Sequence, residues 1–215
     1  MDVRRPDALN LEYTRTMMGF LLFRPRPARI AMVGLGGGSL AKFCYRYLPA
    51  ADITVIEINP QVIALRDEFL IPPDCDRFRV IEDDGADFVR TTSQQFDVLL
   101  TDGYDHRGLP HRLCSQIYYD QCAKVLEPDG MLIANLHFEH QDYVLHIARI
   151  RFSFNGNTLL AEDDDEEYGI VFACRDGLST PLAPIRRPSA LDERTWMSLQ
   201  GPFARVISAF NRKCL

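Results

Sequence analysis

The sequence predicts an α/β fold, a three-layer α/β/α Rossmann-like sandwich on a mostly parallel sheet of seven strands. First, apolar runs of strand length alternate along the chain with longer amphipathic segments. Second, a glycine-rich turn, Gly34-Leu35-Gly36-Gly37-Gly38, joins the first apolar run to the first amphipathic segment. Third, two apolar runs after residue 157 are separated only by an acidic turn, which indicates a C-terminal antiparallel hairpin.

Each element follows from its local pattern. Parallel strands are expected at residues 30–34, 53–58, 78–82, 96–101 and 130–136. Helices are expected at residues 39–47, 60–69, 86–92, 115–126 and 139–151, and Pro60 suits a first helical turn, where its missing N–H costs nothing. The hairpin strands are expected at 157–161 and 168–174, and a last helix at 192–212. Five parallel strands finished by a hairpin are typical of class I methyltransferase-like domains.

The length and composition fit one domain with a sizeable core. The chain has 215 residues, 47% of them hydrophobic, which leaves no room for a second full domain beside a complete sheet. We expect a helical N-terminal segment at residues 1–29 and a nucleotide-binding catalytic domain at residues 30–176. We expect residues 177–215 to form an extension whose helix packs on the same domain.

Charge, hydropathy and cysteine usage exclude several classes of protein. The net charge is −6 and the positive residues are scattered, so nucleic acid is not expected as the main partner. No stretch approaches the roughly 20 apolar residues of a membrane span, and the N-terminus lacks the apolar core of a signal peptide. The six cysteines include no CxxC pair, so we expect reduced thiols, no structural zinc and a cytoplasmic location. His106 and His111 lack a metal-ligand spacing, and no metal site is expected.

The glycine-rich turn is predicted to bind an adenosine. It follows a strand and precedes a helix, and Glu57 ends the next apolar run about twenty residues further on. Glycines let the backbone approach a ligand closely, and the acid accepts hydrogen bonds from ribose hydroxyls. The binding residues expected here are Gly34, Gly36, Gly37, Gly38 and Glu57, with a ligand-free βα turn as the alternative.

Three further acids fall just past the ends of predicted strands, where open α/β sheets bind ligands. Asp84, beside Gly85, would accept the exocyclic amine of an adenine, cap the next helix, or do both. Asp102, before Gly103, would accept a proton or hold an ammonium group, with a turn residue as the alternative. Asp105 would share a cationic substrate with Asp102, or be a solvated loop acid.

Together these motifs resemble the spermidine synthase (polyamine aminopropyltransferase) family. The resemblance extends from about residue 13 to residue 174 and concerns the order, the spacing and the type of the residues. The segments that carry it are residues 33–38, 57, 84–85, 102–105, 113–119 and 126–130. The family's catalytic loop has an Asp, two intervening residues, a second Asp, then Pro, any residue, Gly and Pro. Asp102, Asp105 and Gly108 match that loop, and Pro110 is displaced by one position.

The resemblance implies a role for each of these residues. Asp102 would be the base that takes a proton as an amine attacks the methylene beside a sulfonium, and Asp105 would hold a diamine. Glu57 would bind the ribose, and Asp84 and Gly85 the adenine, of decarboxylated S-adenosylmethionine or its product methylthioadenosine. No tightly bound cofactor is implied, because the sulfonium is already a good leaving group. The acceptor would be a small amine or polyamine, and the resemblance also implies a homodimer.

Several positions depart from the family's pattern. Ser39 stands where the family has an Asp that attracts the ammonium of the aminopropyl group and repels a carboxylate. Tyr13-Thr14-Arg15 replaces Tyr-His-Glu, and His106 replaces the proline after the second loop Asp. The family's N-terminal β-rich domain is not found before residue 30, and acidic residues 162–167 replace its aromatic Thr-Tyr-Pro segment.

These departures leave three functions open. The first is alkyl transfer, specifically aminopropyl transfer, from a sulfonium nucleotide to an amine. The second is methyl transfer from intact S-adenosylmethionine, with S-adenosylhomocysteine as product, in which Ser39 would donate a hydrogen bond to the methionine carboxylate. The third is a non-catalytic nucleotide-binding or interaction module.

Two other features carry expectations. The acidic run at residues 162–167 is either a solvated hairpin turn or a negative collar that draws a cationic acceptor to the cleft. Tyr118 and Tyr119 are expected to pack their helix onto the sheet, with one hydroxyl pointing into the site as the alternative. Trp196 is expected to anchor the C-terminal helix.

Overall fold

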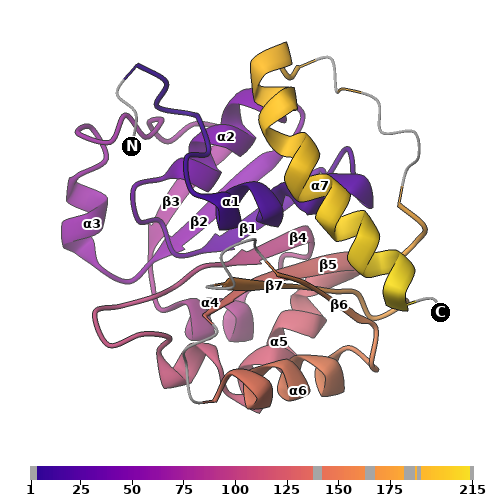
Figure 1. The fold of residues 1–215 in the computed structure, drawn as a ribbon. Coiled ribbons are helices and arrows are strands. Elements are labelled where there is room, and N and C mark those ends of the chain that lie inside the picture. Colours follow the sequence, from indigo (N-terminus) through magenta and orange to yellow (C-terminus); the bar gives the residue numbers. More distant parts are fainter. Residues whose placement is uncertain (1–3, 138–141, 163–167, 182–186, 188–189, 214–215) are drawn as a thin grey trace.

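The computed structural model describes residues 4–137, 142–162, 168–181, 187 and 190–213, and it shows one seven-stranded sheet between two layers of helices (Figure 1). The strands are β1 (Arg29–Val33), β2 (Asp52–Glu57), β3 (Phe78–Glu82), β4 (Phe96–Thr101), β5 (Leu126–His137), β6 (Thr158–Glu162) and β7 (Tyr168–Ala173). Their order is β3-β2-β1-β4-β5-β7-β6, and β7 runs antiparallel to both neighbours. The predicted fold class, a mostly parallel sheet that ends in an antiparallel hairpin, is confirmed.

The helices cover both faces of this sheet. They are α1 (Glu12–Met17), η1 (Met18–Leu22), α2 (Ser39–Tyr47), α3 (Pro60–Ala64), α4 (Gly85–Thr91), η2 (His111–Leu113), α5 (Gln116–Val125), α6 (Tyr143–Ser153) and α7 (Glu193–Lys213). In Figure 1, α1, α2 and α7 lie on one side of the sheet, and α4, α5 and α6 lie on the other. The chain therefore forms the three layers that its alternating pattern predicts.

Each layer of helices closes its own hydrophobic core, because successive side chains of a strand point to opposite faces. In β1, Ile30 and Met32 belong to the core beneath α2 and α7, whereas Ala31 and Val33 belong to the core against α4, α5 and α6. All four side chains are almost fully buried. This explains why the sequence of β1, an interior strand, is a continuous apolar run and does not alternate between apolar and polar residues.

Three aromatic side chains to which the sequence analysis gave a structural role are buried or half-buried in the two cores. Tyr118 and Tyr119 are buried on α5 in the core that faces β1 and β5. Trp196 of α7 is half-buried and packs against the opposite core, and within the same helix its ring meets Phe203 edge-on at 6.0 Å between ring centroids. Both predictions are confirmed.

Two predicted boundaries are wrong. The helix expected at residues 60–69 ends at Ala64, because none of its residues is buried and a helix without tertiary packing has little to sustain it. The strand expected at 130–136 begins at Leu126, but its pairing with β4 shifts register between Phe96 and Val98, so its first residues form an irregularity. The helix expected at 139–151 is observed from Tyr143 to Ser153, and residues 138–141 lie outside the described part.

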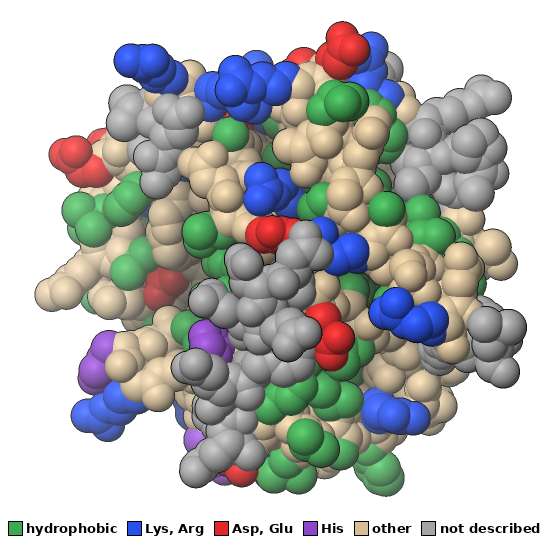
Figure 2. Space-filling model, viewed as in Figure 1, with side chains coloured by type: hydrophobic (Ala, Val, Ile, Leu, Met, Phe, Trp, Pro, Cys, Tyr) green, Lys and Arg blue, Asp and Glu red, His purple; other side chains and the backbone are tan. Residues whose placement is uncertain are grey.

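The surface and the cysteines add three findings. On the face seen in Figure 2, positive and negative side chains are interspersed. Among the helices of the described chain, none combines the length and the apolar character that crossing a membrane requires. The described cysteines, which exclude Cys214, are free thiols, and four of these five are buried.

Candidate active site

A cavity of about 900 Å³ opens where the parallel strands end. The carboxyl ends of β1, β2, β3 and β4 lie side by side, since Val33 is in register with Ile56 and Thr101, and Glu57 with Glu82. The loops that follow these strands therefore meet at one edge of the sheet. Of the predicted site residues, the cavity is lined by Gly34, Gly36, Glu57, Asp84, Gly85, Asp102, Gly103 and Asp105.

The remaining predicted residues, Gly37, Gly38 and Ser39, are not part of the cavity wall. A Cβ on Gly38 would lie 2.5 Å from a side-chain carbon of Ile71, so this glycine is packed against the segment after α3. Ser39 is half-buried at the start of α2. The second half of the glycine-rich turn thus packs onto protein, and the first half faces the cavity.

Position 34 requires glycine. Its φ is +99°, and a Cβ there would lie only 2.4 Å from the backbone oxygen of Asp102. Backbone hydrogen bonds hold this approach, because the Asp102 N–H donates to Val33 at 2.9 Å and the Gly34 N–H to Ile56 at 2.8 Å. The loop after β1 therefore crosses directly over the loop after β4.

Glu57 is buried and fixed by backbone donors. Its Oε2 accepts the N–H of Leu35 in the glycine-rich turn at 2.9 Å, and its Oε1 accepts the N–H of Asn59 at 2.9 Å. Only 9% of its surface is exposed, on the cavity side. Each carboxylate oxygen has a second lone pair, so Glu57 can hold the turn in place and still accept hydrogen bonds from a diol.

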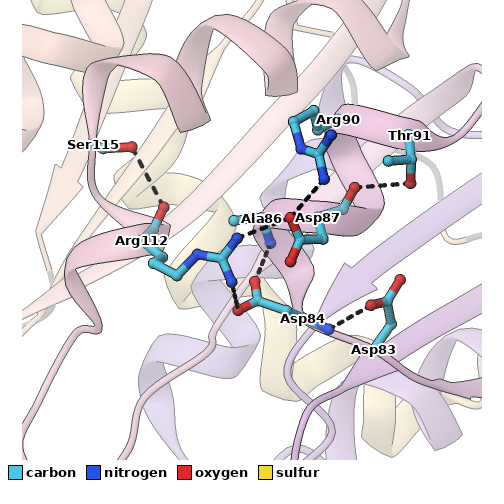
Figure 3. Close-up of polar contacts among 8 residues, drawn as sticks. All are labelled: Asp83, Asp84, Ala86, Asp87, Arg90, Thr91, Arg112 and Ser115. Carbon is cyan, nitrogen blue, oxygen red and sulfur yellow. Dashed lines mark hydrogen bonds and ion pairs between the residues drawn. The ribbon is translucent and has the colours of Figure 1, made fainter.

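Asp84 caps a helix and also forms an ion pair. Its Oδ1 accepts the Ala86 N–H at 2.7 Å at the start of α4, and its Oδ2 contacts Nη1 of Arg112 at 2.5 Å (Figure 3). The guanidinium also reaches Oδ1 of Asp87 at 2.9 Å. The capping role weighed from the sequence is confirmed, while Arg112, which also lines the cavity, was not predicted. It ties the loop after β4 to the first turn of α4.

Asp102 lines the cavity, and two side chains donate hydrogen bonds to it. The hydroxyl of Tyr13 donates to Oδ2 at 3.1 Å, and Nδ2 of Asn135 donates to Oδ1 at 2.8 Å. Burial raises the pKa of this carboxyl to about 6, against the lowering effect of the two hydrogen bonds. A carboxylate with a pKa near neutrality is suited to accept a proton during catalysis.

Aromatic rings form the wall beside Asp102. Tyr13 stacks on Tyr168 with 4.9 Å between ring centroids, and His137 meets the other ring of the pair, Tyr168, edge-on at 4.9 Å. The Tyr104 hydroxyl donates to the backbone oxygen of Asn135 at 3.1 Å. Burial and the negative charge of Asp102 raise the pKa of Tyr13, which keeps its hydroxyl protonated as a donor.

Asp105 lies at the mouth of the cavity and is exposed. Its backbone pairs with Gly108 in a tight turn, and its Oδ1 accepts the Arg107 N–H at 2.7 Å. His106 and His111 also line the cavity, and within the described residues no group of three or more His, Cys, Asp or Glu could hold a metal ion. Most of the acidic run lies outside the described part, which includes only Glu162, the last residue of β6.

Several residues of this site were missed or given no role by the sequence reasoning. Asn135 follows the same strand-end rule as the acids, at the end of β5, so that rule could have found it. Tyr13, Tyr168, Tyr104 and Arg112 had no such signal, because their contacts join segments that are distant in sequence.

Comparison with known proteins identifies the family. Residues 10–151 match the family model of the spermine/spermidine synthase domain. The chain belongs to this family. It is 38% identical over 160 residues to a polyamine aminopropyltransferase of Chromobacterium violaceum, covering 74% of this chain and 61% of that protein. The chain thus spans about three fifths of the length of the curated relatives it matches.

Solved structures show the same fold at lower identity. A spermidine synthase in complex with the transition-state analogue AdoDATO is 18% identical with a TM-score of 0.68, covering 90% of this chain and 75% of that one. Human methyltransferase-like protein 13 in complex with SAH is 20% identical with a TM-score of 0.69, covering 92% and 93%. This member of the spermidine synthase family therefore shares its fold with both of these proteins.

Proposed function

We propose that this protein transfers an aminopropyl group from a sulfonium nucleotide, decarboxylated S-adenosylmethionine, to an amine. The observation that carries the proposal is Asp102, whose carboxylate has a raised pKa and lies in the cavity wall one strand away from the glycine-rich turn. Membership of the spermine/spermidine synthase family supports it.

The nucleotide would bind along the loops after β1, β2 and β3. In this proposal Glu57 accepts both ribose hydroxyls, Asp84 accepts the adenine amine, and Gly34 and Gly85 let the backbone approach the ligand. The burial of Glu57 and its fixed orientation support this assignment, because little freedom remains to be lost on binding.

The reaction needs one base and correct alignment. Asp102 takes a proton from the ammonium form of the acceptor, and the nitrogen lone pair then attacks the methylene carbon next to the sulfonium. A nitrogen–carbon bond forms, the carbon–sulfur bond breaks, and its electron pair goes to sulfur, which leaves as neutral methylthioadenosine. The proton on Asp102 passes to solvent. The sulfonium supplies the driving force, so the protein contributes positioning, exclusion of water and deprotonation.

The acceptor is proposed to be a small amine or polyamine. Asp105 at the cavity mouth would hold a second ammonium group, and the rings of Tyr13 and Tyr168 would contact the carbon chain.

We also propose that the protein acts in the cytoplasm, where free thiols stay reduced. We further propose that it is a homodimer, which sedimentation analysis would test.

Two measurements test the proposal. Calorimetry with decarboxylated S-adenosylmethionine, S-adenosylmethionine and methylthioadenosine ranks the nucleotides, and tightest binding of intact S-adenosylmethionine would instead favour methyl transfer. Turnover with putrescine should be lost in Asp102→Asn while nucleotide binding stays near that of the parent, because an amide cannot take the proton. The matched control is Asp52→Asn, an exposed acid at the opposite end of β2. Undiminished turnover in Asp102→Asn would refute the assignment of the base.

A further inference from the structure

The Asn135 side chain uses its NH₂ group in a hydrogen bond but leaves its carbonyl oxygen without a partner in the described part of the chain. It lies at the end of β5, it is only 3% exposed, and it lines the cavity beside Asp102. Its Nδ2 donates to Asp102, but its carbonyl oxygen Oδ1 is buried and has no hydrogen-bond partner among the described residues. A buried acceptor without a donor is uncommon in native proteins and calls for an explanation.

The orientation of this amide follows from the chemistry of its neighbour. A carboxylate only accepts hydrogen bonds, so the amide must turn its NH₂ group toward Asp102 and its oxygen away from it. The backbone allows little adjustment, because Asn135 is paired with Ile170 of β7 and its carbonyl accepts the Tyr104 hydroxyl. Thr101 of β4 and Ala134 of β5 are paired, and Asp102 and Asn135 are the next residues of the two strands. The pairing of the strands therefore holds these two side chains next to each other.

We propose that Oδ1 of Asn135 accepts an N–H of the attacking amine, so that Asn135 is a second catalytic contact of the nucleophile. The inference rests on the proposed amine transfer. An amine whose lone pair points at the reacting carbon has its N–H bonds directed away from that carbon. After Asp102 has taken the ammonium proton, its unprotonated oxygen accepts one of the two remaining N–H bonds and Asn135 accepts the other, and together they aim the lone pair. Asn135 takes no proton, because an amide oxygen is not a base at neutral pH.

This arrangement specifies the class of acceptor. A primary amine has two N–H bonds when its lone pair attacks, and it satisfies both acceptors. A secondary amine has one, and it leaves the buried oxygen of Asn135 without a donor. Sites built to hydrogen-bond a substrate group discriminate strongly against analogues that lack it, because the buried partner stays unpaired. The protein should therefore prefer primary to secondary amine nitrogens.

The experiment compares putrescine with N,N′-dimethylputrescine, in which both nitrogens are secondary, in the parent protein and in Asn135→Ala and Asn135→Leu. Both variants also lose the hydrogen bond from Asn135 to Asp102, and this loss should slow transfer to both amines equally. The ratio of the kcat/KM values for the two amines therefore reports only the contact between Oδ1 and the amine. Rates are compared on the alkaline plateau, since both variants also raise the pKa of Asp102. We expect the preference for putrescine to fall about tenfold in both variants, mainly through kcat, which corresponds to about 1.4 kcal/mol.

Three outcomes would overturn the inference. Equal slowing of both amines would make Asn135 a structural partner of Asp102 only. If the preference for putrescine changed in Asn135→Ala but not in Asn135→Leu, the cause would be the space left by the shorter alanine side chain, because leucine fills that space. An unchanged preference in both variants, with melting temperatures close to that of the parent, would exclude any contact.

Failure of the proposed function gives a different result. The parent would then transfer nothing to either amine, whatever nucleotide is supplied. In that case calorimetry of the methylthioadenosine-loaded protein tests Asn135 without turnover. Putrescine should bind more tightly than N,N,N′,N′-tetramethylputrescine, whose ammonium ends carry one N–H each, and both variants should reduce that difference. An unreduced difference would refute the contact.

Discussion

Removing the Tyr13 hydroxyl should raise the pKa of Asp102 and move the acidic limb of the rate profile to higher pH. The hydroxyl donates to Oδ2 of Asp102 at 3.1 Å, and this hydrogen bond favours the ionised form. A hydrogen bond to a charged group contributes about 1.5–3 kcal/mol, and one pKa unit corresponds to about 1.4 kcal/mol. In Tyr13→Phe the pKa should therefore rise by roughly one to two units from its present value of about 6.

The assay is the pH dependence of kcat/KM with putrescine for the parent, Tyr13→Phe and Tyr104→Phe. Tyr104 is the matched control, because it lies in the same wall but donates to the backbone oxygen of Asn135 and not to Asp102. We expect Tyr13→Phe to lose activity near pH 7 and to regain most of it near pH 9, and Tyr104→Phe to move the limb much less. An acidic limb at the parent's pH in Tyr13→Phe, or the same shift in both variants, would refute the reasoning.

Three other outcomes follow from the site. Glu57→Gln should weaken methylthioadenosine binding by about 1.5–3 kcal/mol in calorimetry, since the diol loses an ionised acceptor, and unchanged affinity would refute the ribose assignment. Asp102→Asn should stabilise the protein at pH 8 by up to about 3 kcal/mol in urea unfolding. The pKa of Asp102 is about 6 in the folded protein and 3.8 in its ordinary state, so the parent loses stability as the pH rises from 3.8 to about 6. Below pH 4 the carboxyl is protonated in both states, and the stability difference between the variant and the parent should vanish. Arg112→Gln should slightly destabilise the protein at low salt and not at 1 M salt, where the Debye length is about 3 Å, and a salt-independent effect would contradict an ionic tie.

Much of the fold could be predicted because its signals are local. The glycine-rich turn and the apolar run of β1 lie in one short segment, and parallel strands buried on both faces have a composition that sequence shows directly. The acids at strand ends could be predicted for a topological reason, since parallel strands bring their carboxyl ends to one edge. Glu57 and Asp102 thus face the same cavity although 45 positions separate them.

The neighbours that set the chemistry of those acids could not be predicted in this way. Arg112 reaches Asp84 across 28 positions, and no periodicity connects a loop after β4 with the first turn of α4. Tyr168 stacks on Tyr13 from the first residue of β7, a contact that exists only after the hairpin has paired with β5. The early end of α3 has a similar cause, because its sequence is compatible with a longer helix but nothing buries it.

The donor that tunes Asp102 depends on a part of the chain outside the family match. Tyr13 lies on α1, a helix of six residues that is too short to be stable alone. Helix α7 packs against α1, and Arg205 of α7 forms an ion pair with Glu12, the residue before Tyr13. The family match ends at residue 151, whereas α7 spans Glu193–Lys213. The topology of the sheet thus accounts for where the carboxylate of Asp102 lies, and helix α7 supports the side chain that lowers the pKa of that carboxylate.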